Sequence, residues 1–330
     1  MSKPIVLVTA AAASEETQQL LGGAGIELVF MQGTVDEVSL LKAFSCYRIA
    51  AVILRGPAPF TRAVFDEAKA LKIISKYGAG IDSVDLQSAT AHGIAVMVTM
   101  GANAGAVAEH ALALMLALAR DLPRFDRELR KGVWKDPHYV VRDFSARTVG
   151  IVGYGQIGQR TAQLASACGA KVVVHSRTRS ALPSEMDWEP SLDRLLGRVD
   201  ILSLHCPLTD QTRGMIGEKQ FRLMKPGALL INTARGKLVD EPALIAALKR
   251  GRLAGAGLDT FATEPPDPAG PLLLLPNVLC TPHVAAYTTD AGALMGTICA
   301  HNIISYLRGE IYDRRNLMNP EVLDVVNRES

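Results

Sequence analysis

The sequence predicts an α/β fold of two doubly wound domains, each built around a parallel sheet, and three observations lead to this prediction. The chain has 330 residues, which suits two domains at roughly 150 residues each. Its strand-like runs are continuously apolar, as in parallel strands that are covered on both faces. Helical stretches separate these runs in two successive series, so each series predicts a sheet between layers of helices.

The first series occupies the first hundred residues. Its helical stretches at 14–25, 35–46 and 61–70 carry apolar residues at helical spacing. Each also has Ser, Asp or Thr near its start, where such side chains cap the first amides of a helix. The expected strands are 4–10, 26–31, 50–54, 72–76 and 94–98.

A long helical stretch, residues 103–132, joins the two series, and we expect a break near Pro123. Ala and Leu make this stretch apolar nearly all round, so it should be buried between domains or subunits. A last apolar helix is expected at 290–309. The strands expected in the second series, which ends near residue 285, are 148–152, 171–175, 200–205, 227–234, 253–259 and 277–282.

A glycine-rich turn opens the second series. Gly153, Gly155 and Gly158 follow an apolar strand in the G-x-G-x-x-G pattern. The first glycine allows a tight turn, the second lets backbone approach a pyrophosphate, and the third allows close packing of helix on strand. The helix that begins near Gln156 and Ile157 aims its amides at the phosphates. The pattern predicts a dinucleotide-binding Rossmann domain.

The segment after the next strand indicates which dinucleotide binds. An acid is expected there to accept a hydrogen bond from the ribose 2′-hydroxyl of NAD, but residues 170–184 contain no Asp or Glu. Ser176, Arg177 and Arg179 offer donors and positive charge instead, and guanidinium groups match phosphate oxygens. We therefore predict NADPH as the preferred cofactor, with NAD possible. The alternative is that both arginines are solvated turn residues.

These features divide the chain into two domains. We expect a discontinuous substrate-binding domain made of residues 1–100 and 286–330, and a dinucleotide-binding domain over residues 101–285. Both are expected to be doubly wound, Rossmann- or flavodoxin-like. In such folds ligands bind at the carboxyl ends of the strands, so the cleft between the domains is the expected site.

Polar residues follow three strands of the second series. Arg235, Asp259, Glu264 and His283 stand in "NTARG", "GLDTFATEPP" and "CTPH". Hydride attack on a ketone builds negative charge on the oxygen, which needs a proton donor and a fixed positive charge. His283 suits the first task, because a neighbouring carboxylate favours a charged imidazole. Arg235 suits the second, because its charge cannot be titrated away.

These motifs, the glycine turn, and "KYGAGIDSVDL" and "AVAEHALALMLALAR" in the first half resemble the D-isomer-specific 2-hydroxyacid dehydrogenase family over nearly the whole chain. The resemblance implies that Arg235 holds the substrate carboxylate, His283 exchanges the proton and Glu264 bonds the imidazole. It also implies Cys206, Pro207 and Thr212 along the adenosine, Thr233, Ala234 and Asp259 at the nicotinamide, and the backbone of Gly78, Ala79 and Gly80 at the substrate carboxylate.

The resemblance implies an oxidoreductase that interconverts a small 2-oxo acid, of the glyoxylate or hydroxypyruvate type, and the D-2-hydroxy acid. Glu264 argues against the formate dehydrogenase branch, which carries Gln there. A short D-3-phosphoglycerate dehydrogenase without a regulatory domain is a second candidate, with Arg55 and Lys76 either binding an anionic substrate or serving only the structure. A corepressor-like protein that senses a dinucleotide without turnover is a third.

Composition gives no sign of other partners. The net charge is +2 and the basic residues are scattered, so neither nucleic acid nor a membrane is expected. Five cysteines without a Cys-x-x-Cys pair suit a reducing cytoplasm. No second ligand pair accompanies "CTPH", so we expect no metal. The apolar helix from Asn103 and the segment "GVWKDPHY" resemble the family's dimer contacts, which implies a homodimer.

Overall fold

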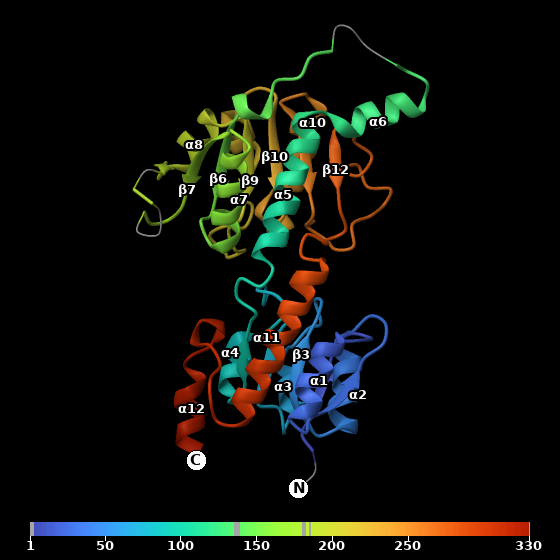
Figure 1. The fold of residues 1–330 in the computed structure, drawn as a ribbon, viewed down its shortest axis with the longest axis vertical. Coiled ribbons are helices and arrows are strands. Elements are labelled where there is room, and N and C mark those ends of the chain that lie inside the picture. The colour runs from blue at the N-terminus through green and yellow to red at the C-terminus, as the bar shows by residue number, and fades with distance from the viewer. Residues whose placement is uncertain (1–2, 135–138, 180–182, 185, 330) are drawn as a thin grey trace. The chain divides into compact units, whose positions relative to one another are not determined.

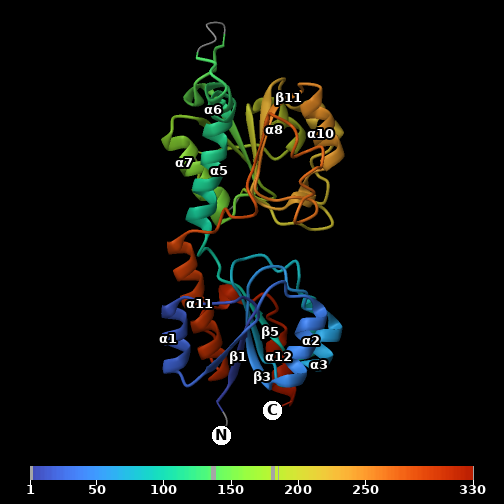
Figure 2. The same cartoon turned by 90° about the vertical axis from the view of Figure 1, so that its right-hand side faces the viewer.

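The computed structural model describes residues 3–134, 139–179, 183, 184 and 186–329, and their side chains as far as residue 325. Residues 135–138 of "GVWKDPHY" therefore lie outside the described part of the chain. The protein divides into two compact units, Met1–Asn103 with Thr288–Ser330 (unit 1) and Ala104–Tyr287 (unit 2). Each unit is a parallel sheet covered by helices on both faces (Figures 1 and 2), as predicted.

Unit 1 holds a five-stranded parallel sheet in the order β2-β1-β3-β4-β5. Helices α1 and α11 cover one face, and α2 and α3 cover the other (Figure 2). The strands are β1 (Ile5–Val8), β2 (Glu27–Phe30), β3 (Ile49–Leu54), β4 (Ile73–Lys76) and β5 (Ala95–Met97). The helices are α1 (Glu15–Gly23), α2 (Glu37–Cys46), α3 (Arg62–Glu67), α4 (Leu86–Ala91), α11 (Thr289–Leu307) and α12 (Val322–Glu329).

Helix α11 returns the end of the chain to unit 1. Cys299 and Ile303 on this helix are fully buried in the core against the sheet. Asn302, also buried, donates from Nδ2 to Ser75 Oγ (3.2 Å) and to Val98 O (3.1 Å). These bonds satisfy polar groups at strand ends that would otherwise be costly to bury. The first domain is therefore completed by residues nearly two hundred positions downstream.

Unit 2 holds a seven-stranded parallel sheet in the order β12-β11-β10-β9-β6-β7-β8. Helices α5 and α7 cover one face, while α8 and α10 cover the other (Figure 2). The strands are β6 (Thr148–Val152), β7 (Lys171–His175), β8 (Asp187–Trp188), β9 (Ile201–Leu204), β10 (Ala228–Asn232), β11 (Leu253–Leu258) and β12 (Val278–Cys280). The helices are α5 (Ala104–Ala119), α6 (Leu122–Arg130), α7 (Gln156–Ala167), α8 (Leu192–Arg198), α9 (Glu218–Leu223) and α10 (Glu241–Lys249).

The strand order of unit 2 places a switch point beside β6. That strand pairs with β7 on one side and β9 on the other, so the chain leaves β6 and β9 in opposite directions along the sheet. The carboxyl ends of strands at such a point form the usual ligand crevice of an open α/β sheet. The glycine-rich turn follows β6 directly.

The long helical stretch breaks near Pro123, as predicted. Helix α5 ends at Ala119, and Asp121 adopts a left-handed conformation (φ +50°) before α6 begins. Pro123 lies in the first turn of α6, where its missing amide costs no helical hydrogen bond. No helix among the described residues is long and apolar enough to cross a membrane.

Candidate active site

The glycine-rich turn packs as a phosphate-binding turn requires. Gly153 has φ +94°, and a Cβ there would lie 2.7 Å from the carbonyl carbon of His205. A Cβ on Gly158 would lie 2.1 Å from Gly153 O. A Cβ on Gly155, by contrast, would meet nothing within 4 Å. The outer glycines are needed for packing, and the middle one leaves open space next to the start of α7, where a pyrophosphate would fit.

The buried polar atoms without a hydrogen-bond partner among the described residues include His205 Nδ1 and Thr233 Oγ1. These residues directly follow β9 and β10. Burial lowers the pKa of His205 to about 4, so its imidazole is neutral at ordinary pH. Buried polar atoms in native proteins are rarely left unpaired, so this edge of the sheet fits a polar ligand. Thr233 is among the predicted residues, whereas nothing in the sequence singled out His205.

The segment expected to select the cofactor is a surface turn after β7, which we call the 176–179 turn. Ser176 Oγ donates to Thr178 O at 2.7 Å. Arg177 and Arg179 are both exposed. The position suits contact with a ribose phosphate, because Gly153 N donates to His175 O (2.8 Å) and so ties the end of β7 to the glycine-rich turn.

The residues expected along the adenosine form a compact loop after β9. Thr212 Oγ1 donates to Pro207 O at 2.7 Å. Cys206 is half-buried with its sulfur 3.8 Å from Met215 Sδ. Burial raises the pKa of the Cys206 thiol to about 11, so it remains a neutral packing group.

The three residues expected to be catalytic come from three loops of unit 2. Arg235 follows β10, Glu264 lies in the loop between β11 and β12, and His283 follows β12. The first two loops are in direct contact at Gly236, where a Cβ would lie 1.9 Å from the carbonyl carbon of Phe261. Only glycine lets the Arg235 turn approach the Glu264 loop this closely.

His283 and Glu264 form a hydrogen-bonded pair. His283 Nδ1 lies 2.7 Å from Glu264 Oε2, and the Phe261 amide donates to Glu264 Oε1 at 3.0 Å. Partial burial by itself would raise the pKa of Glu264. The bonds from His283 and Phe261 and the charges of His283 and Arg235 outweigh burial, so the pKa of Glu264 is lowered. Glu264 is therefore an anion that orients the imidazole and leaves Nε2 directed away from the pair.

Asp259 holds the backbone on either side of His283 through hydrogen bonds. Its carboxylate is fully buried, and Oδ1 accepts from Thr281 Oγ1 (2.6 Å) and Val284 N (2.9 Å), while Oδ2 accepts from Ala285 N (3.0 Å). These bonds enclose His283, whose backbone adopts φ +55°. A left-handed histidine persists only where its surroundings fix it. The described contacts give Asp259 the task of shaping this segment, and its bond to a nicotinamide carboxamide stays a prediction.

The residues expected to bind substrate from unit 1 have clear local partners. The Gly78 amide donates to Thr99 Oγ1 at 2.8 Å, so the amides suited to a substrate carboxylate are those of Ala79 and Gly80. Lys76 is only 8% exposed, and its Nζ donates to Gly56 O at 2.5 Å.

Arg55 is likewise engaged within unit 1. It donates from Nη1 to Ala12 O (3.0 Å), and its guanidinium lies 4.5 Å from the centre of the Tyr77 ring. These contacts, like those of Lys76, favour the structural interpretation of both cations. The described residues contain no group of three His, Cys, Asp or Glu side chains that could hold a metal ion.

Comparison with known proteins places these features in one family. The family model for the NAD binding domain of D-isomer specific 2-hydroxyacid dehydrogenases matches residues 112–285. The chain is 42% identical over 273 residues to a glyoxylate reductase from Korarchaeum cryptofilum, covering 81% of this chain and 82% of that protein. It is 37% identical over 298 residues to a D-3-phosphoglycerate dehydrogenase from Archaeoglobus fulgidus, covering 90% of this chain but 56% of that protein.

The fold of this chain resembles that of a solved structure over nearly the full length of both chains. It is an NADPH-dependent glyoxylate/hydroxypyruvate reductase from Sinorhizobium meliloti in complex with NADP and malonate, 29% identical, with a TM-score of 0.82 and coverage of 97% of this chain and 98% of that one. The fold, the glycine-rich turn and the paired histidine and glutamate are thus found in a chain that belongs to the D-isomer specific 2-hydroxyacid dehydrogenase family.

Proposed function

We propose that this protein is an NADPH-preferring reductase that converts a small 2-oxo acid, such as glyoxylate or hydroxypyruvate, to the D-2-hydroxy acid. The observation that carries the proposal is the 2.7 Å bond between His283 and Glu264, formed on the same unit as Arg235 and the glycine-rich turn. The glyoxylate reductase from Korarchaeum cryptofilum supports the choice of substrate class.

In this proposal each side chain has one chemical task. Bound NADPH would supply the hydride. Arg235 would hold the substrate carboxylate with its guanidinium fork and polarise the carbonyl. Because Nδ1 of His283 faces Glu264, Nε2 would give its proton to the carbonyl oxygen. Glu264 would favour the charged imidazolium and hold its orientation. In unit 1, the amides of Ala79 and Gly80 remain predicted donors to a substrate carboxylate.

The proposed cofactor site uses the same edge of the sheet. The first amides of α7, at Gln156 and Ile157, would bind the pyrophosphate together with the glycine-rich turn. The 176–179 turn would bind the 2′-phosphate. Along the rest of the cofactor we keep the predicted residues: Cys206, Pro207 and Thr212 at the adenosine, and Thr233, Ala234 and Asp259 at the nicotinamide.

The test is a steady-state comparison of kcat/KM with NADPH and NADH over a panel of 2-oxo acids. Glyoxylate or hydroxypyruvate with NADPH should give the highest value, with NADH at least tenfold lower. Equal or better turnover with NADH would contradict the cofactor preference. Tight dinucleotide binding without turnover of any acid would favour the corepressor-like alternative.

A second candidate, D-3-phosphoglycerate dehydrogenase, has one observation in its favour: the 37% identity to the Archaeoglobus fulgidus enzyme. This chain spans just over half of that relative's length. Including 3-phosphohydroxypyruvate in the same panel separates the candidates. A kcat/KM at least tenfold above that for glyoxylate would support the phosphorylated substrate.

We also propose that the protein acts as a cytoplasmic homodimer. Helix α6 has no buried residue, and it exposes Leu122 (54%), Phe125 and Leu129 (56%) to solvent. Exposed apolar side chains gathered on one helix mark a surface that a partner covers, and a second copy is the simplest partner. Light scattering at micromolar concentration should give twice 35.3 kDa, and a monomer would contradict the proposal.

All five cysteines are unpaired, as expected in a reducing compartment.

A further inference from the structure

Strand β8 lies at the edge of the seven-stranded sheet, directly beside the 176–179 turn. It has two residues, Asp187 and Trp188, which pair with Val173 and Val174 of β7. So short an edge strand forms few backbone bonds, so its position must depend on side chains. The sequence offers no apolar run here and did not predict a strand.

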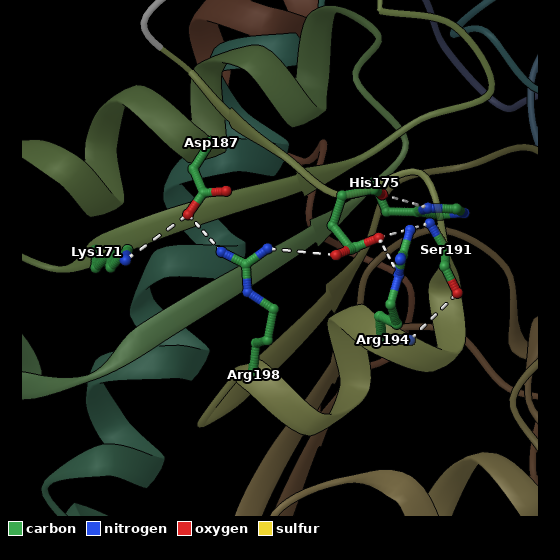
Figure 3. A network of polar contacts seen from close by, with 7 residues as sticks. Lys171, His175, Asp187, Ser191, Arg194 and Arg198 are labelled. Atoms are coloured by element: carbon green, nitrogen blue, oxygen red, sulfur yellow. Dashed lines mark hydrogen bonds and ion pairs between the residues drawn. The ribbon is translucent and has the colours of Figure 1, made fainter.

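A charged network anchors β8 to helix α8 (Figure 3). Arg198 bonds both carboxylates, with Nη2 at 2.6 Å from Asp187 Oδ2 and Nη1 at 3.4 Å from Glu189 Oε2. Arg194 Nε donates to Glu189 Oε1 at 3.0 Å, and Lys171 Nζ lies 3.7 Å from Asp187. Glu189 is 8% exposed, so solvent screens its bonds to Arg194 and Arg198 less than it screens pairs in open water.

Trp188 stands between the two anchored carboxylates. Because successive side chains of a strand point to opposite faces, the anchoring of Asp187 and Glu189 sets the direction of Trp188. Its indole Nε1 donates to Ser176 O at 3.4 Å, and its ring centre lies 5.9 Å from the Arg179 guanidinium. Trp188 thus contacts both ends of the 176–179 turn.

We propose that Trp188 is a positioning residue for cofactor selection: it holds the 176–179 turn in the form that binds the 2′-phosphate of NADP(H). The inference rests on the proposed NADPH preference and deepens it. The indole fixes the Ser176 carbonyl and with it the peptide plane that carries the Arg177 amide, so the start of the turn is held in one arrangement. A cation–π contact with the Trp188 ring restricts the positions that the Arg179 guanidinium can take. Neither contact would affect NAD, which has no 2′-phosphate.

Two substitutions separate the two contacts in the full-length protein. Trp188→Leu removes both the ring and the donor, whereas Trp188→Phe keeps a ring for Arg179 and removes the Nε1 donor. We measure dissociation constants for 2′,5′-ADP and 5′-AMP, which differ by the 2′-phosphate alone, and for NADPH and NADH. Trp188→Leu should weaken 2′,5′-ADP and NADPH by roughly three- to tenfold. It should leave 5′-AMP and NADH within twofold, with Trp188→Phe in between. Tyr47→Leu, which removes an exposed aromatic side chain after α2 in unit 1, is the matched control and should leave all four dissociation constants within twofold.

Equal weakening of both members of each pair would mean that Trp188 serves only the fold, and would overturn the inference. Failure of the proposed function has a different signature, read from the wild type: 2′,5′-ADP would bind no tighter than 5′-AMP. That result would overturn the inference as well, since no 2′-phosphate site would remain to be positioned.

Fluorescence gives a readout that does not depend on altering Trp188. In Trp134→Phe, Trp188 is the only tryptophan, so emission excited selectively from tryptophan reports on this residue. When a 2′-phosphate takes up the Arg179 guanidinium, the environment of the indole changes. Saturating 2′,5′-ADP should therefore shift or quench the emission, and saturating 5′-AMP should not. Identical spectra with both nucleotides would contradict the proposal even if Trp188→Leu fails to fold.

Discussion

Two loop regions of unit 2 are held in different ways. The segment around His283 is fixed by a buried carboxylate, Asp259, which accepts three hydrogen bonds from residues 281–285. The 176–179 turn is exposed, and its contacts to Trp188 are one long hydrogen bond and one ring contact. The segment expected to carry the chemistry is held by hydrogen bonds to a buried carboxylate. The turn expected to select the cofactor is held by contacts with Trp188 at the protein surface.

This difference has a physical meaning for catalysis. Proton transfer depends steeply on the distance and orientation of the donor, so a rigid buried support is required. Recognition of a 2′-phosphate depends mainly on charge placed nearby, which an exposed turn can supply. Substitutions in the first region should therefore reduce the rate with either cofactor, and substitutions in the second should change only the preference between cofactors.

The largest effect is expected at His283. His283→Ala removes the proton donor and should lower kcat by roughly 10²–10⁴-fold, equally with NADPH and NADH. His301→Ala, on α11 of unit 1 where the ring stacks on Tyr312, is the matched control and should keep kcat within twofold. Steady-state assays with both cofactors check this. A His283→Ala enzyme with near-normal kcat would remove His283 from the mechanism.

The next effect is expected in the 176–179 turn. Arg177→Ala loses one charge-assisted contact, which typically contributes about 1.5–3 kcal/mol, so NADPH should bind roughly ten- to a hundredfold more weakly. NADH binding should change little, and kcat at saturation should hold. Arg222→Ala, at another exposed arginine, which pairs with Glu218 on α9, controls for the loss of one charge. Parallel weakening of both cofactors by Arg177→Ala would contradict the division between the two regions.

The sequence predicts the architecture well, because continuous apolar strands and helical periodicity are local signals. The strand expected at 148–152 and the strand expected at 171–175 agree with β6 and β7. Two-residue β8 has no such signal, since side-chain bonds to α8 hold it in place. The helix break predicted near Pro123 falls at Asp121, and Pro123 itself lies in the first turn of α6, a position that proline favours.

The sequence predicts which residues form the candidate site, but not the contacts between loops that hold them in position. The motifs identify Glu264 and His283, and the structure brings them to 2.7 Å. No local sequence pattern predicts that Gly236 contacts the backbone of Phe261, twenty-five positions away. Nor does a local pattern predict that Asp259 bonds the segment around His283. Such contacts form only when distant loops meet, so no local pattern records them.

The smallest effect is on acid stability. The folded state lowers the pKa of Glu264, so its charged form contributes stability that is complete above the ordinary value of about 4.5. That contribution is lost as the pH falls through the lowered pKa. The difference in urea midpoint between wild type and Glu264→Gln should therefore shrink as the pH falls below about 4.5. A difference that grows as the pH falls below about 4.5 would contradict the assigned direction.

The central claim is that Glu264 and His283 work as one unit that delivers the proton. The most direct measurement is kcat/KM for glyoxylate reduction by NADPH against pH, in wild type and in Glu264→Gln. The substitution keeps a hydrogen-bonding group but removes the charge that favours the imidazolium, so activity should begin to fall at a lower pH than in the wild type, and the loss should grow as pH rises. Two profiles that fall at the same alkaline pH would contradict the claim.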